Sequence, residues 1–304
     1  MGGSGAGAGS SSTYPQMSAA PTGSSAPAPA SNGNGQSWKL VWQDDFAGTG
    51  LPDGWNFQVN GNGFGDKSLA WFGDSNARLT GQGGLVITAE RGGSGHTCWY
   101  GPCQYTSAEI ATSFAQEYGQ FEARIKLPSG IGLWPAFWMV PLANEGAQVV
   151  PGEIDIIEVN NQNPDEVSGY AHDGSVFSYK AEKLLSASSS SQYHVYGVNW
   201  TPTGITWTLD GKPYGHIGAY KNWPFDRPFI MLLDLAVGGT WPGSPNAATV
   251  FPAEMQVSWV RVYKMVSLLL HYGDDRDGRT CGEVSARTCL ALSFASGRAV
   301  LWLA

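Results

Sequence analysis

The sequence has few charged residues and no long apolar run. Only 14% of its 304 residues are charged, and 25 acidic residues outnumber 17 basic ones, which gives a net charge of −8. We expect neither nucleic acid nor an anionic membrane surface as a partner, because this charge would repel both. No stretch of 18 apolar residues occurs, so the sequence predicts no transmembrane helix. A neutral polymer is compatible with this composition.

Cysteine is also scarce. The four cysteines fall into two close pairs, Cys98/Cys103 and Cys281/Cys289. A hairpin over residues 98–103 could close as a disulfide in an oxidising compartment, whereas a zinc site would need further ligands and only His96 is near. A disulfide is therefore favoured over free thiols or a metal site, but the sequence alone does not decide the oxidation state of either pair.

The amino-acid composition changes twice along the chain, near residues 36 and 264. Residues 1–36 are almost wholly Gly, Ser, Ala, Pro, Thr and Asn. Such a segment cannot bury enough apolar surface to fold, so it is predicted to be a flexible leader or linker. It has neither the basic start nor the apolar core of a signal peptide. Residues 37–264 form one predicted domain. Residues 265–304 are a C-terminal tail for which the sequence predicts neither a structure nor a role.

The pattern within residues 37–264 is that of short strands. Segments rich in β-branched and aromatic residues alternate with turn residues, as at 85–89, 121–127 and 257–263. Residues 206–212 are predicted to form a β-hairpin with Asp210-Gly211 at its tip. Long helical periodicity is absent, so the sequence predicts an all-β sandwich or jelly roll. The 13 tryptophans are typical either of an aromatic β core or of a carbohydrate-binding surface.

The most informative segment is residues 152–160, GEIDIIEVN. Glu153 and Asp155 fall on one face of a strand, because side chains alternate along it. Glu158 is five positions from Glu153, so we predict a one-residue β-bulge near residues 156–157 that returns it to the same face. Three carboxylates on one face repel one another, which favours a functional use over an ordinary exposed polar face. A calcium cage is a further alternative, but calcium ligands usually come from loops.

Glycoside hydrolysis is the chemistry that fits these acids. A retaining mechanism requires a nucleophilic carboxylate and a protonated carboxylic acid about 5–5.5 Å apart. With the bulge, the Cα atoms of Glu153 and Glu158 would be about 13 Å apart, a gap that two Glu side chains on a concave sheet can largely close. Asp155 between them would hydrogen-bond the nucleophile and help to keep Glu158 protonated by charge repulsion.

Residues 153–158 also resemble the E-x-D-x-x-E signature of glycoside hydrolase family 16, in the bulged form of its laminarinase-type members. Further segments similar to that family occur in order: YGQFEARIKLP at 118–128, GLWPAFWM at 132–139, LAVGGTWPG at 235–243 and WVRVY at 259–263. The resemblance spans about residues 38–264. It implies a β-jelly-roll of two antiparallel sheets with an open substrate cleft, and an endo-acting, retaining β-1,3-glucanase.

The resemblance implies a role for each matching residue. Glu153 would be the nucleophile, Asp155 its assisting acid and Glu158 the acid/base. Four residues would bind substrate: Trp134 as the floor of the subsite at the cleavage point, Trp138 in the same motif, His172 lining the cleft, and Trp241 as a subsite wall. Core packing is the alternative for each tryptophan and is favoured for Trp138, while a structural role is the alternative for His172.

The sequence departs from the family pattern at the border of the cleft. Residues 66–68 stand where Asn-Asn-Glu-Leu is frequent, Glu109 stands where an arginine is common, and Asp234 replaces a frequent asparagine. These departures leave the fine substrate preference open. The family's structural calcium site often has an aspartate where Ser258 stands here, so calcium binding is also left open. We expect no cofactor to be required for catalysis.

We therefore expect a secreted monomer that hydrolyses β-1,3-glucan or mixed β-1,3/1,4-glucan through a glycosyl-enzyme ester on Glu153. The location is inferred from this function alone. The alternatives are transglycosylation to a sugar acceptor, a non-catalytic glucan-binding module, and hydrolysis of galactans. The intact glutamates disfavour the binding module, and the net charge of −8 disfavours charged carrageenan but not neutral agar.

Overall fold

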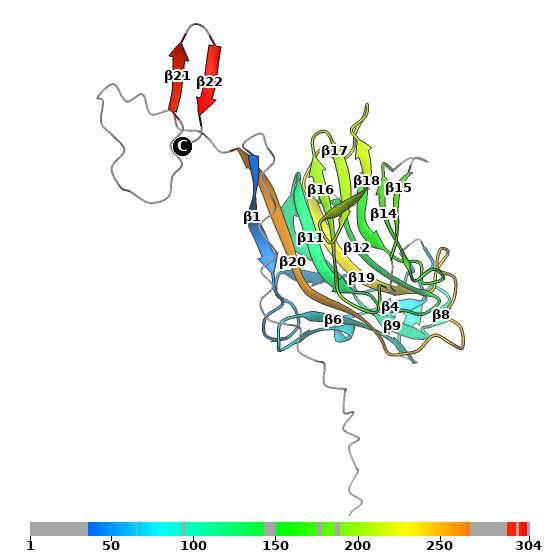
Figure 1. Ribbon diagram of the computed structural model, residues 1–304. Coiled ribbons are helices and arrows are strands. Elements are labelled where there is room, and N and C mark those ends of the chain that lie inside the picture. The colour runs from blue at the N-terminus through cyan, green and yellow to red at the C-terminus, as the bar shows by residue number, and fades with distance from the viewer. Residues whose placement is uncertain are drawn as a thin grey trace, which may run out of the picture. The chain divides into compact units, whose positions relative to one another are not determined.

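The computed structural model is built almost entirely of β-strands (Figure 1). It describes residues 36–64, 66–92, 95–142, 150–174, 178–185, 189–267, 291–295 and 298–302. The chain divides into two compact units, residues 1–267 and 268–304. In the described part of the chain, no helix is long and apolar enough to cross a membrane.

Two large sheets make up the first unit. Sheet I has eleven strands, which are β1 (Gln36–Asp44), β2 (Thr49–Gly50), β4 (Ala70–Phe72), β5 (Ala77–Thr80), β6 (Leu85–Arg91), β9 (Tyr105–Ser107), β11 (Gly119–Lys126), β16 (His194–Thr201), β17 (Gly204–Leu209), β18 (Lys212–Gly218) and β20 (Ala253–Ser267). Its main path runs β18-β17-β16-β11-β20-β6-β5-β2, with β1 paired to β20 and β9 paired to β4 and β6.

Sheet II has seven strands in the order β15-β14-β13-β12-β19-β10-β3. They are β3 (Trp55–Phe57), β10 (Glu109–Gln116), β12 (Leu133–Pro141), β13 (Glu153–Glu158), β14 (Glu166–His172), β15 (Ser178–Leu184) and β19 (Phe229–Val237). The short strands β7 (Thr97–Cys98) and β8 (Gly101–Pro102) form a small hairpin, and η1 (Asp74–Asn76) is a single 3₁₀ turn. The predicted all-β sandwich of antiparallel sheets is confirmed.

The core lies between the two sheets. Trp200 on β16 and Phe229 on β19 are both fully buried, and their rings meet edge to face with centroids 5.0 Å apart. Trp207 on β17 is also fully buried and reaches sheet II, where its indole Nε1 donates a hydrogen bond to the backbone oxygen of Asp155 at 2.8 Å. Each such aromatic side chain contributes roughly 1.5–3 kcal/mol through burial. Together they fix how sheet I lies against the strand that carries the acids.

The hairpin predicted at Asp210-Gly211 is confirmed. Leu209 pairs with Lys212, and the two residues between them have φ angles of 49° and 74°. Two positive φ angles are what a type I′ turn requires, and glycine at the second position adopts one without steric cost.

The second unit is described only by a hairpin of β21 (Ala291–Ala295) and β22 (Arg298–Trp302). Cys281 and Cys289 lie outside the described residues, as do residues 1–35 of the predicted leader.

Candidate active site

A β-bulge in β13 brings three acids to one face of sheet II. Ile157 pairs with Phe137 on β12 and Asp155 pairs with the next residue, Trp138, so Ile156 is the extra residue. On the other side, the partners of the three acids on β14 are alternate residues: Glu153 pairs with His172, Asp155 with Tyr170 and Glu158 with Ser168. Alternate residues share a face, so the three carboxylates do as well. The predicted bulge is confirmed.

Three isoleucines that point into the core between the sheets hold the bulge in place. Ile154, Ile156 and Ile157 are fully buried and point away from the acids, which ties the register of β13 to the core. The indole of Trp207 passes beside β14 at Gly169, where an added Cβ would lie 2.2 Å from the indole Cδ1. Only glycine leaves room there for the hydrogen bond to the Asp155 backbone oxygen.

The three acids line a pocket of about 190 Å³. Three further carboxylates line it, from Asp66 in the loop before β4, Glu109 on β10 and Asp234 on β19. The other lining residues are apolar, aromatic or small: Gly63, Phe64, Ser68, Phe72, Trp134, Ala136, Trp138 and Ala236. Among the described residues that line the pocket, none is Lys or Arg. We call this site the six-carboxylate pocket.

Glu158 has the environment of a proton donor. Its Oε1 accepts a hydrogen bond of 2.7 Å from the indole Nε1 of Trp134. Burial raises the pKa of Glu158 well above its usual value, and the nearby Asp155 raises it further, while the bond from Trp134 acts in the opposite direction. A carboxyl that keeps its proton near neutral pH can act as a general acid.

Glu153, Asp155 and His172 form a compact group, with one ligand atom from each lying within 4.8 Å of the others. His172 Nε2 is 3.1 Å from Asp155 Oδ2, and its Nδ1 is 2.6 Å from Ser178 Oγ. Burial raises the pKa of Glu153, but the nearby His172 lowers it. Burial raises the pKa of Asp155 well above its usual value, and repulsion from Glu153 adds to this. The pKa of Asp155 is therefore raised more strongly than that of Glu153, which has His172 to offset part of the effect of burial.

Trp134 and Trp241 form an aromatic corner beside these acids. Their ring centroids are 5.1 Å apart in an edge-to-face arrangement, and Trp241 lies 6.2 Å from the ring of Tyr170. Tyr170 in turn stacks on His172 at 5.5 Å. Three of the residues predicted to bind substrate, Trp134, Trp241 and His172, are therefore linked by ring contacts through Tyr170, and of these three only Trp134 lines the pocket itself.

Trp138 lies on the other side of the pocket. It packs against a small cluster of Ala111, Ile230 and Leu232, outside the main core between the sheets. Its Nε1 donates a hydrogen bond of 3.0 Å to Asp234 Oδ1. Trp138 is half-buried and combines packing against this cluster with a place in the pocket wall, because alternation along β12 turns it away from sheet I.

Asp66, Glu109 and Asp234 line the pocket but had been given no role. The sequence identified them only as departures from the family pattern. Glu109 and Asp234 are far apart in the chain and meet through the pairing of β10 with β19. Local sequence carries no signal of such a pairing, so their meeting could not be predicted.

A disulfide-bonded hairpin supports the loop that carries Asp66. The predicted bond between Cys98 and Cys103 is present. Trp99 Nε1 donates to the Ser68 backbone oxygen at 2.8 Å, and the Tyr100 hydroxyl donates to the Leu69 backbone oxygen at 2.7 Å. The hairpin thus holds one wall of the pocket through backbone contacts.

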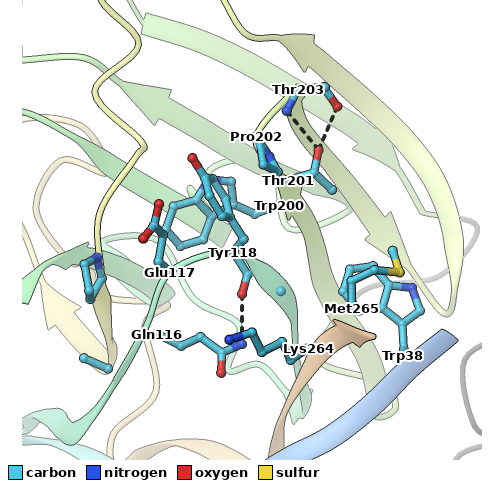
Figure 2. A pocket seen from close by; sticks show the side chains of 13 residues that line it. Trp38, Gln116, Glu117, Tyr118, Trp200, Thr201, Pro202, Thr203, Lys264 and Met265 are labelled. Carbon is cyan, nitrogen blue, oxygen red and sulfur yellow. Dashed lines mark hydrogen bonds between the residues drawn. The ribbon is translucent and has the colours of Figure 1, made fainter. Parts of the chain in front are cut away.

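A larger hollow of about 940 Å³ lies elsewhere on the first unit (Figure 2). Trp38 pairs with Met265 at one side of it, and Gln116 donates a hydrogen bond of 2.8 Å to the Tyr118 backbone oxygen. Glu117 is the only carboxylate among the described residues that line it. Without a second carboxyl it lacks the pair of groups that glycoside hydrolysis requires, so the six-carboxylate pocket is the candidate active site.

One group of side chains at the pocket has the composition of a metal site. In the described part of the chain, Glu153, Asp155 and His172 are the only group of three side chains that could hold an ion. This group coincides with the acids assigned to catalysis. At the position where calcium would be expected, Ser258 offers a hydroxyl rather than a carboxylate, a poorer ligand for a hard cation.

Comparisons with known proteins agree with this geometry. Residues 65–261 match the model of glycosyl hydrolases family 16. A beta-glucanase of Rhodothermus marinus is 36% identical over 253 residues, covering 75% of this chain and 86% of that protein. A glucan endo-1,3-beta-glucosidase of Cryptopygus antarcticus is 36% identical over 231 residues, covering 68% of this chain and 83% of that protein. The solved endo-beta-1,3-glucanase of Pyrococcus furiosus superposes with a TM-score of 0.73 at 34% identity, covering 79% of this chain and 99% of that one.

Proposed function

The chain belongs to family 16 of the glycosyl hydrolases, and from this premise we propose how its six-carboxylate pocket cleaves glucan. The enzyme hydrolyses internal bonds of β-1,3-glucan or mixed β-1,3/1,4-glucan with retention of configuration. The observation that carries the residue roles is the bulge of β13, because it alone places Glu153 and Glu158 on one face.

In the first step, the Glu153 carboxylate attacks the anomeric carbon and forms a glycosyl-enzyme ester. Glu158 gives its proton to the glycosidic oxygen of the departing sugar. The raised pKa of Glu158 supports this role, because the group must hold a proton at the start of the cycle. In the second step, the Glu158 carboxylate removes a proton from water, which attacks the ester and releases the sugar.

Asp155 positions the nucleophile. Burial and repulsion from Glu153 raise its pKa well above the usual value, which favours the protonated form, and in that form it can donate a hydrogen bond to Glu153 and hold that carboxylate toward the sugar. His172 lies 3.1 Å from Asp155 Oδ2 and lowers the pKa of Glu153. Trp134 and Trp241 offer indole surfaces on which the apolar face of a sugar ring can stack.

We further propose that the enzyme works as a secreted monomer without a cofactor. The nucleophile, the acid and the base are all carboxyl groups of this one chain, so the reaction needs neither a metal nor an organic group. The disulfide between Cys98 and Cys103 supports an oxidising, extracellular setting.

The test measures release of reducing sugar from laminarin, lichenan, xyloglucan and agarose by the wild type, Glu153→Ala and Glu158→Ala. We expect both variants to lose activity on laminarin, with azide restoring turnover of an activated glycoside only in Glu153→Ala. Glu182→Ala is the control, because Glu182 is exposed on β15 and lies outside the pocket.

Activity that survives both substitutions would overturn the roles given to the two glutamates. A wild type that cleaves no glucan would overturn the function itself. Product analysis separates hydrolysis from transglycosylation, because a transglycosylase would make longer chains in place of new reducing ends.

A further inference from the structure

Glu109 and Asp234 form a second pair of carboxyl groups in the pocket. They are directly opposite each other on β10 and β19. The same row continues across sheet II, since Asp234 is opposite Ala136 on β12 and Ala136 is opposite Glu158 on β13. Neighbouring strands are about 4.8 Å apart, so Asp234 stands roughly 10 Å from Glu158 along the row. Alanine between them leaves the space above the row open.

Asp234 and Glu109 differ in the hydrogen bonds that their carboxyl groups accept. Asp234 is 7% exposed and accepts the hydrogen bond from Trp138. Glu109 is 5% exposed, and no hydrogen bond from a described residue reaches its carboxyl group. A buried polar group without a partner is costly, and Glu109 faces the pocket. Its carboxyl group is therefore available to a hydroxyl group that enters the pocket.

The surroundings of the pair are acidic. Asp66 faces it from the loop before β4, and Glu153, Asp155 and Glu158 face it from β13. None of the described lining residues is Lys or Arg, and His172 lies beyond, on Asp155. Burial raises the pKa of Glu109 well above its usual value, and repulsion from Asp234 raises it further. Burial raises the pKa of Asp234 to about 7. Two such groups share one proton more readily than they hold two charges.

Resting on the function proposed above, we propose that Glu109 and Asp234 are a specificity-determining pair that binds hydroxyl groups of a neutral sugar unit and rejects units carrying carboxylate or sulfate. A carboxyl next to a carboxylate offers one donor and several acceptors, which matches a sugar hydroxyl that both donates and accepts. The indole of Trp138 lies beside the pair. An anionic substituent there would meet a carboxylate in a desolvated pocket that contributes no basic side chain among the described lining residues.

The test compares two β-1,3-glucans, neutral laminarin and carboxymethylated curdlan, in the wild type, Glu109→Gln, Asp234→Asn and the double variant. Each amide keeps the shape of the side chain and its capacity to hydrogen-bond but removes its charge. We expect the wild type to prefer laminarin in kcat/KM, and the double variant to reduce this preference at least about tenfold at low ionic strength. On laminarin, KM should change more than kcat, because the pair contacts a bound sugar and not the reacting bond.

A pH series separates a binding role from a merely structural one. In the wild type, the KM for laminarin should rise as pH increases past about 7, because the pair then loses the proton with which it donates to a sugar hydroxyl oxygen. In Glu109→Gln this rise should be smaller, because the Gln amide still offers a donor after Asp234 has lost its proton. Glu182→Gln on exposed β15 is the matched control and should keep the wild-type preference and pH profile.

The outcomes distinguish the two proposals. A wild type that fails on laminarin would overturn the proposed function and this inference with it. Normal laminarin cleavage, together with a preference and a KM profile that do not change in folded Glu109→Gln and Asp234→Asn, would overturn only the role of the pair. Thermal unfolding of each variant shows whether it is folded, and Glu109→Gln alone suffices if the double variant is not.

Discussion

The hydrogen bond from Trp134 to Glu158 should set the alkaline limit of the enzyme. The indole Nε1 lies 2.7 Å from Glu158 Oε1 and lowers a pKa that burial raises. Trp134→Phe removes the donor and keeps an aromatic ring. We expect the pKa of Glu158 to rise further, so that the enzyme stays active at higher pH than the wild type.

The size of the shift follows from the kind of bond that is lost. A hydrogen bond to an ionised carboxylate contributes about 1.5–3 kcal/mol, and one to the neutral acid about 0.5–1.5 kcal/mol. The difference of about 1–1.5 kcal/mol favours the ionised form of Glu158 in the wild type. One pKa unit corresponds to about 1.4 kcal/mol, so the alkaline limb of the pH profile of kcat/KM should move up by about one pH unit.

The assay is kcat/KM for laminarin across the pH range, which reports the ionisations of the free enzyme. Trp138→Phe is the matched control, because its indole donates to Asp234 and not to Glu158. Losing that bond favours protonation of Asp234 and so weakens its repulsion of Glu158, which should leave the limb in place or lower it. A limb that stays in place or moves down in Trp134→Phe would refute the reasoning. A uniform loss of activity at every pH would mean that Trp134 acts only as a binding surface.

Three further predictions concern stability. Trp207→Phe leaves the backbone oxygen of Asp155 without its indole donor, so the free energy of unfolding should fall by about 1–3 kcal/mol in urea titrations, and kcat should fall with it; an unchanged urea midpoint would contradict this. The pKa values of Asp155 and Asp234 are higher in the folded protein than in the unfolded chain, so as pH rises the unfolded chain gives up these protons before the folded protein does. The free energy of unfolding should therefore decrease as pH rises from about 4 to about 7. Melting temperatures that increase over this range would contradict the prediction. The double substitution Cys98→Ser and Cys103→Ser opens a short loop and should lower the free energy of unfolding by about 2 kcal/mol. KM should rise by a larger factor than kcat falls, because the hairpin supports a pocket wall. Equal factors in both constants would argue against that support.

Much of the site could be predicted because its signals are local. Alternation along a strand and the odd spacing of Glu158 from Glu153 required a bulge, and the pairing of β13 with its neighbours contains one. The turn at Asp210-Gly211 follows from the φ angles that those residues tolerate. The disulfide between Cys98 and Cys103 joins residues that are close in the chain. In each case, the residues that determine the feature are neighbours in sequence.

The tertiary structure alone decided which residues face the acids from the other strands. The row Glu109, Asp234, Ala136 and Glu158 is assembled from four neighbouring strands of the sheet, of which only β12 and β13 follow one another in the chain. β19, which carries Asp234, is buried along its whole length, so no alternation in its sequence shows which face meets the pocket. The register of such a strand is fixed by long-range backbone pairing and by the core on its far side. For that reason the sequence determined the strand that carries the three acids and its chemistry, and the long-range pairing of strands within sheet II determined the second carboxyl pair that stands beside it.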